Sequence, residues 1–277
     1  FILFIFYINY IMTNTIDIDI DKSNPKIIYY YQTFTGLKNI LHPNPTVTHI
    51  HLSSIHFGNS DNNYYIHLND NNPDNKIFDE LWKELTLAHS YGIKIVLMIG
   101  GAGGAYIDLF NNFDIYYKLL CDMLNKYSII NGIDFDVEES IGLKNIEMLI
   151  NKMKNDYNHF TFSMAPIQSS LMRDINGMGG FVYKDLYNSN VGQYIDYYNT
   201  QFYYDYSKDC YDTIIKNEYN SKKIVMGMIS SQNIDENYNI IKLLLKEYKN
   251  DFGGVFFWEY CQAPINWDTT IHALFYP

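Results

Sequence analysis

The chain has 277 residues, of which 47% are hydrophobic and 18% are charged. This length suits one barrel-sized domain or two small ones, with enough apolar residues for a large core. The net charge of −11 argues against a nucleic-acid partner, because clustered Lys and Arg side chains bind a phosphate backbone. A neutral or cationic ligand fits this charge better. The three widely separated cysteines lack the spacing of a metal site.

The chain begins with an apolar stretch, FILFIFYINYIM. This stretch is too short to span a bilayer, and it lacks the basic start and small-residue cleavage site of a signal peptide. We therefore expect residues 1–24 to form a tail outside the fold and residues 25–277 to form the folded domain. No other segment is apolar enough to span a membrane. Secretion and an intracellular location both stay open.

Eight short segments have the continuous Val, Ile, Tyr and Phe content of strands that are buried on both faces. They are residues 26–34, 47–57, 94–101, 129–138, 159–166, 194–204, 222–230 and 253–260. Amphipathic helical patterns separate most of them, at residues 78–92, 116–127, 145–157, 211–219 and 239–254. The connections at 58–77 and 167–193 are long, and the first is an Asn- and Asp-rich loop or short hairpin.

Strands that alternate with helices indicate a parallel α/β fold. Eight such units in a chain of this length predict a (β/α)8 TIM barrel. The interval from 228 to 253 holds one helix, so we expect a single domain without an inserted α+β subdomain.

The fourth predicted strand carries three acids, in the segment NGIDFDVE. Because side chains alternate along a strand, Asp134, Asp136 and Glu138 share one face, with successive residues on that face about 6.6 Å apart. In a barrel the acids would point inward, and Glu138 would lie at the C-terminal mouth, where barrel enzymes have their active sites. Confined carboxyls share protons, so at least one pKa rises, and a glutamic acid can then act as a general acid.

Two other interpretations of these acids are weaker. A solvated face of an exposed strand conflicts with the apolar flanks. A divalent metal site would need more hard ligands, and no His or Cys cluster supports one. The sequence therefore favours a proton donor with no metal.

The segment NGIDFDVE resembles the D-G-x-D-x-D-x-E signature of glycoside hydrolase family 18, the chitinase family. Other segments resemble the strands of that family in the same order: KIIYYYQTF, KIVLMIGGAGGAY, FSMAP, NTQFYY, KIVMGM and GGVFFWEY. The GAGGAY portion is most similar to the compact, hevamine-like class III chitinases. The resemblance spans roughly residues 25–260, and it implies the same barrel that the strand count predicts.

The resemblance implies a role for each matching residue. Glu138 would be the general acid and base, Asp136 would contact the acetamido group of the substrate, and Asp134 would tune Asp136. Tyr203 would hold the acetamido group from the other side. The implied substrate-binding residues are Trp258 as the sugar floor, with Gln201, Met164, Tyr30, Gly100 and Gly101 around the pocket.

The sequence departs from the family pattern at three positions. Asn131 replaces the first Asp of the signature, Tyr204 stands where Asn is usual, and Ala102 follows the double Gly where long-groove members carry Trp. The last two departures bear on which sugars the groove can hold. The short connection after the seventh strand implies a shallow, open groove that is suited to cleavage within a chain.

We therefore expect a monomeric retaining endo-glycosidase that cleaves β-1,4-linked N-acetylglucosamine chains, most simply chitin, without a cofactor. The substrate's own acetamido oxygen would act as the nucleophile, as the resemblance implies. The alternatives are an endo-β-N-acetylglucosaminidase on N-glycans, an enzyme on peptidoglycan, and an inactive chitinase-like lectin. The intact Asp134, Asp136 and Glu138 favour an enzyme over the lectin.

Overall fold

The computed structural model describes residues 25–61 and 63–277 of the chain. The prediction that residues 1–24 form a tail concerns residues outside this described part. Within the described part, no helix combines the length and the apolar character needed to cross a membrane.

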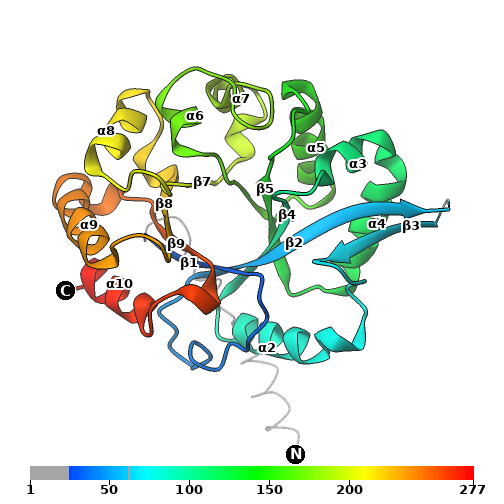
Figure 1. The fold of residues 1–277 in the computed structure, drawn as a ribbon, viewed down its shortest axis with the longest axis horizontal. Coiled ribbons are helices and arrows are strands. Elements are labelled where there is room, and N and C mark those ends of the chain that lie inside the picture. Colours follow the sequence, from blue (N-terminus) through cyan, green and yellow to red (C-terminus); the bar gives the residue numbers. More distant parts are fainter. Residues whose placement is uncertain (1–24, 62) are drawn as a thin grey trace, which may run out of the picture.

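Eight parallel strands close into a barrel, as the sequence predicts. Strand β1 pairs in parallel with β2 on one side and with β9 on the other, which closes the sheet in the order β1-β9-β8-β7-β6-β5-β4-β2. Figure 1 shows the helices arranged around the outside of these strands. The barrel strands are β1 (Lys26–Tyr31), β2 (His49–Ser60), β4 (Lys94–Gly100), β5 (Ile130–Asp136), β6 (Thr161–Met164), β7 (Tyr197–Thr200), β8 (Ile224–Ile229) and β9 (Gly254–Trp258).

The ninth strand, β3 (Asn63–Leu68), is antiparallel to the far half of β2. The two form a hairpin that projects beyond the barrel (Figure 1). The predicted Asn- and Asp-rich connection thus contains the short hairpin that its sequence allowed.

All five predicted helices are present, with ends shifted by a few residues. They are α2 (Asp79–Ser90), α4 (Phe113–Lys126), α5 (Leu143–Asp156), α8 (Lys208–Lys216) and α9 (Ile234–Tyr248). The only regular element between β8 and β9, apart from the short 3₁₀ helix η4 (Lys249–Asp251), is α9, so no subdomain is inserted there.

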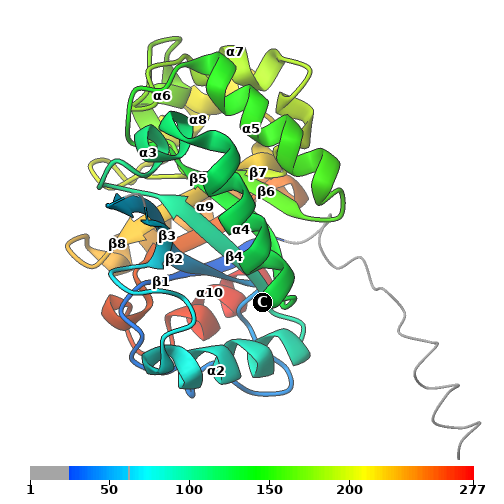
Figure 2. The same ribbon diagram turned by 90° about the vertical axis from the view of Figure 1, so that its right-hand side faces the viewer.

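The sequence patterns missed four further helices, three of them short. They are α3 (Ala105–Asn111), α6 (Gln168–Met172), α7 (Tyr183–Asn188) and α10 (Trp267–Phe275). Helices α6 and α7 occupy the predicted long connection, and both views place them on the opposite side of the barrel from α2 (Figure 1, Figure 2). The remaining 3₁₀ turns are η1 (Lys76–Phe78), η2 (Gly192–Tyr194), η3 (Ser221–Lys223) and η5 (Tyr260–Gln262).

The barrel wall separates two apolar regions. The larger one lies between the strands and the helices, and it contains Ile133 and Phe135 of β5. A smaller cluster lies inside the barrel and consists of Ile28, Tyr30, Met98, Tyr197, Val225 and Phe256. The alternation of side chains along each strand produces this division, and it leaves alternate positions of β5 facing inward.

Candidate active site

The three acids of β5 form a row that climbs from the barrel interior to its carboxyl mouth. Asp134 is completely buried and Asp136 is 6% exposed. Glu138 lies just beyond the end of the strand, is half-buried, and lines a cavity at the mouth. The intervening Ile133 and Phe135 pack on the helix side, so the predicted shared face of the acids is confirmed.

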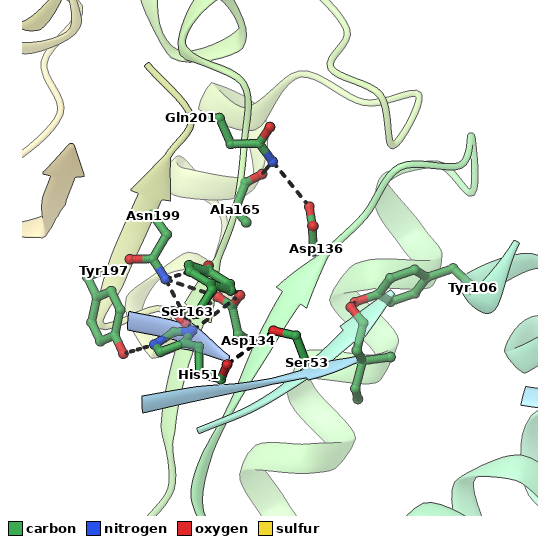
Figure 3. A network of polar contacts seen from close by, with 12 residues as sticks. His51, Ser53, Tyr106, Asp134, Asp136, Ser163, Ala165, Tyr197, Asn199 and Gln201 are labelled. Carbon is green, nitrogen blue, oxygen red and sulfur yellow. Dashed lines mark hydrogen bonds and ion pairs between the residues drawn. The ribbon is translucent and has the colours of Figure 1, made fainter. Parts of the chain in front are cut away.

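Asp134 is the lowest acid, and four side chains from different strands surround it (Figure 3). The hydroxyl of Tyr30 donates a hydrogen bond of 2.7 Å to Oδ2, and the hydroxyl of Ser163 donates one to Oδ1. The amide of Asn199 lies 3.4 Å from Oδ1 and donates at 2.8 Å to the Tyr30 hydroxyl. Nδ1 of His51 lies 3.4 Å from Oδ2, and both side chains are fully buried.

This surrounding network determines the protonation of Asp134. Burial alone would raise the pKa of its carboxyl. The charge and hydrogen bond of His51, with the hydroxyls of Ser163 and Tyr30, outweigh burial and hold the pKa below its ordinary value. Asp134 therefore stays ionised in the barrel interior.

The two upper acids are shifted in the opposite direction. Burial, followed by the charges of Glu138, Asp134 and Glu139, raises the pKa of Asp136 well above its usual range. Burial and the charge of Glu139 also raise the pKa of Glu138. The row thus combines an ionised acid at its base with two acids above it that hold protons to higher pH.

Residues that follow β7 form another part of the cavity wall. Nε2 of Gln201 donates to the carbonyl oxygen of Ala165 at 2.9 Å and lies 3.5 Å from Oδ1 of Asp136. Burial and the acid row raise the pKa of Tyr203 well above its ordinary value, so its hydroxyl remains a hydrogen-bond donor. The next residue, Tyr204, is 97% exposed and does not line the cavity.

The end of β4 approaches the acid row so closely that only glycine fits there. Gly100 has φ of +96°, and a Cβ atom on it would lie 2.3 Å from the carbonyl oxygen of Asp136. The N–H of Gly101 donates to that same oxygen at 2.9 Å. This contact joins the glycine-rich loop 100–104 to the strand that carries the acids.

A single cavity brings most of the predicted site residues together. Its volume is about 330 Å³. Trp258 forms part of its wall, with its ring centroid 5.3 Å from that of Tyr30 beneath it. The lining residues are Gln32, Ser54, His56, Met98, Gly100, Gly101, Ala102, Asp136, Glu138, Gln201, Tyr203 and Trp258.

A second hollow of about 640 Å³ adjoins this cavity and shares four of its lining residues, Gln32, Ser54, His56 and Ala102. Its outer wall is the β2–β3 hairpin, where the rings of Tyr65 and His67 stack with centroids 4.3 Å apart. The two hollows form a continuous groove, which we call the mouth groove.

Two predicted pocket residues lie elsewhere. Tyr30 is buried below the cavity and bonds Asp134, which fits its expected place at the pocket base. Met164 is completely buried in the core between strands and helices and does not line the cavity. The neighbouring Ser163 takes the inward position on β6, so alternation turns Met164 outward.

Several residues that shape the site were not predicted from the sequence. His51, Ser163 and Asn199 surround Asp134, and Glu139 lies beside Glu138. His51 is fully buried within the predicted strand 47–57, where a buried polar side chain is itself a signal. Within residues 25–61 and 63–277, no group of three or more His, Cys, Asp and Glu side chains is arranged to hold a metal ion.

The fold and much of the sequence are similar to solved glycosidase structures. A fungal endo-β-N-acetylglucosaminidase from glycosyl hydrolase family 18 is 28% identical with a TM-score of 0.81, covering 91% of this chain and 99% of that chain. A chitinase from Aspergillus fumigatus is 28% identical with a TM-score of 0.78, covering 90% and 99%. A family-18 chitinase from Pseudoalteromonas aurantia shares the fold at 18% identity, with a TM-score of 0.72 and coverage of 90% and 99%. No protein-family model and no curated protein sequence matches the chain.

The closed barrel, the acid row at its mouth and these similarities define the chain as a glycoside hydrolase. Among glycoside hydrolases, it is similar to the compact single-domain enzymes of family 18.

Proposed function

We propose that this glycoside hydrolase is a retaining endo-glycosidase that cleaves β-1,4-linked N-acetylglucosamine chains, with chitin or chito-oligosaccharides as substrate. The observation that carries the proposal is the convergence of Asp136, Glu138, Gln201, Tyr203 and Trp258 on one cavity. Such a set supplies a proton donor, hydrogen-bonding groups for an acetamido substituent, and an aromatic surface for a sugar ring.

In the first step, the protonated carboxyl of Glu138 donates its proton to the glycosidic oxygen as the bond from that oxygen to C1 breaks. The acetamido oxygen of the same sugar forms the new bond to C1, so that an oxazolinium ion replaces a covalent enzyme intermediate. The raised pKa of Glu138 keeps it protonated to higher pH than an exposed glutamate, which is what a general acid requires.

In the second step, the Glu138 carboxylate takes a proton from water as the water oxygen bonds C1. The acetamido oxygen leaves C1, and the product keeps its β configuration. The proton returns to Glu138, so the enzyme is ready for another cycle.

The groups around the acetamido substituent have complementary hydrogen-bonding abilities. Asp136 retains a proton because its pKa is raised, so its carbonyl oxygen can accept from the acetamido N–H while its hydroxyl turns to a neighbouring carboxylate. Tyr203 remains a phenol and can donate to the acetamido oxygen. These contacts would orient the nucleophile against C1.

The mouth groove supports cleavage within a chain. It runs from the cavity past His56 to the β2–β3 hairpin, which leaves room for further sugars beyond the reacting one. No inserted subdomain stands above β8 and β9 in the described part of the chain.

A second candidate is an endo-β-N-acetylglucosaminidase on N-glycans, because the fungal enzyme of that name is as similar in sequence as the chitinase, at 28% identity. Peptidoglycan cleavage would use the same site chemistry. Binding without hydrolysis, as in a chitinase-like lectin, is disfavoured by the complete acid row.

The test compares the wild-type protein and Glu138→Gln on chitin oligomers and on a high-mannose glycopeptide. We expect the wild type to shorten the oligomers and the variant to lose at least about 100-fold in rate. Cleavage of the glycopeptide alone would favour the second candidate. Tight binding of oligomers without cleavage would refute the enzyme and support the lectin. Wild-type rates in the variant would refute the role of Glu138.

A further inference from the structure

Glu139 is a fourth carboxylate at the mouth of the barrel, and it follows Glu138 directly. The two side chains point in different directions: Glu138 lines the cavity, whereas Glu139 does not. Glu139 is half-buried and turns toward the start of α3. It has no part in the proton transfers described above.

The carboxylate of Glu139 holds the far end of the glycine-rich loop. Oε1 accepts a hydrogen bond from the N–H of Gly104 at 2.7 Å, and Oε2 accepts one from the N–H of Tyr106 at 3.3 Å. A charged acceptor makes such bonds to backbone amides stronger than a neutral one does.

The loop 100–104 needs such an anchor because four of its five residues are glycines, which lose much conformational freedom on folding. It is held near its start by the bond from Gly101 to Asp136, and in its middle by Nε2 of His56, 3.1 Å from the carbonyl oxygen of Ala102. Glu139 is the third attachment. Together the three contacts fix the part of the loop that lines the cavity.

Glu139 also acts on Glu138 through its charge. After burial, it is the group that raises the pKa of Glu138, and it contributes to the raised pKa of Asp136. The other ionisable side chains that face the upper acids are Asp134 below them on β5, Tyr30 of β1, Tyr106 of α3, Tyr183 of α7, Tyr203 after β7, and His56 of β2 in the cavity wall. The lining residues of the cavity include no Lys or Arg to offset the negative charge.

We infer that Glu139 is a positioning residue with two functions: its carboxylate anchors the loop that walls the sugar cavity through the amides of Gly104 and Tyr106, and it places a negative charge directly beside Glu138. This inference rests on the proposed role of Glu138 as the general acid. It adds a residue that touches neither the substrate nor the reacting atoms, and it explains why a second Glu stands next to the first.

The charge function is tested with Glu139→Gln, which removes the charge while its amide oxygen can still accept from Gly104. The carboxyl carbon of Glu138 is titrated by ¹³C NMR in the wild type and the variant. We expect the Glu138 midpoint to fall by about 0.5 to 1 pH unit, because a like charge has been removed. The matched control is Asp108→Asn, which removes a charge from α3 and should leave the midpoint in place. An unchanged midpoint in Glu139→Gln would overturn the charge function.

The anchoring function is tested by hydrogen exchange at the amides of Gly104 and Tyr106. Exchange should accelerate at least about tenfold in Glu139→Ala and much less in Glu139→Gln, because only the first removes the acceptor altogether. Equal exchange in the wild type and Glu139→Ala would overturn the anchoring function.

Neither measurement requires turnover, so both remain informative if the wild type cleaves no chitin oligomer and the proposed function fails. Where the wild type is active, the alkaline limb of its kcat profile should shift to lower pH in Glu139→Gln with KM nearly unchanged. Glu139→Ala should also raise KM several-fold. An alkaline limb that stays in place in Glu139→Gln would contradict the inference while leaving the proposed function intact.

Discussion

The buried pair of His51 and Asp134 makes a direct prediction about stability. Nδ1 of His51 and Oδ2 of Asp134 are 3.4 Å apart, and both side chains are fully buried. Coulomb attraction between two opposite unit charges at this distance is worth about 5 kcal/mol at an effective dielectric constant of about 20, before the cost of burying both charges. Replacing His51 with Gln should therefore lower the free energy of unfolding by about 3 kcal/mol, since an uncompensated carboxylate is left in the barrel.

The pH dependence of this loss has a definite sign. The pKa of Asp134 is depressed in the folded protein, so its contribution to stability is present above the unfolded-state pKa and is lost as pH falls through the folded value. In His51→Gln the folded pKa rises, so stability should begin to fall at higher pH than in the wild type.

A double-mutant cycle with chemical denaturation isolates the pair. His51→Gln should cost much less in an Asp134→Asn background than in the wild type, because the carboxylate that needs the counter-charge has gone. The control is the substitution His49→Gln. His49 is a buried histidine of the same strand, and its ring centroid lies 6.5 Å from that of His51. Equal costs of His51→Gln in both backgrounds would refute the reasoning.

Three further substitutions test other parts of the site. Tyr203→Phe should lower kcat by about 100-fold with little change in KM, because it removes the hydrogen bond that orients the acetamido oxygen against C1; unchanged kcat would remove Tyr203 from the mechanism. Gly100→Ala should lower the free energy of unfolding by at least about 2 kcal/mol more than Gly92→Ala, measured by thermal or chemical denaturation. Both glycines have positive φ, +96° and +87°, but only at Gly100 would the added Cβ clash with a neighbouring atom, the carbonyl oxygen of Asp136. Met164→Ala should lower the free energy of unfolding by about 2 to 5 kcal/mol and leave KM unchanged, because Met164 is buried and does not line the cavity. Met98→Ala should raise KM, because Met98 does line the cavity. A raised KM in Met164→Ala would show that Met164 contributes to substrate binding.

Much of the fold could be predicted from the sequence because each barrel strand is a short run of β-branched and aromatic residues. The eight runs and the five longer amphipathic helices follow from local periodicity alone. The short helices α3, α6 and α7 could not be found in this way. Each has seven residues or fewer, so its formation depends on tertiary contacts such as Glu139 at the start of α3.

The acid row was predictable because polar side chains at every second position stand out within a buried strand. The placement of Met164 was not, since β6 is buried along its whole length and its pattern does not reveal which alternate positions face inward. The hydrogen-bond and ion-pair partners of Asp134 could not be predicted either. Tyr30, His51 and Asn199 come from distant parts of the chain, and only closure of the barrel brings them together.

In the proposed reaction, Glu138 donates a proton while the substrate's acetamido oxygen attacks C1. The most direct measurement is the anomeric configuration of the first-formed product, followed by ¹H NMR as a chitin oligomer is cleaved. Retention through an oxazolinium ion predicts that the new reducing end appears first as the β anomer and then equilibrates by mutarotation. Initial appearance of the α anomer would show a single displacement by water and would contradict the account.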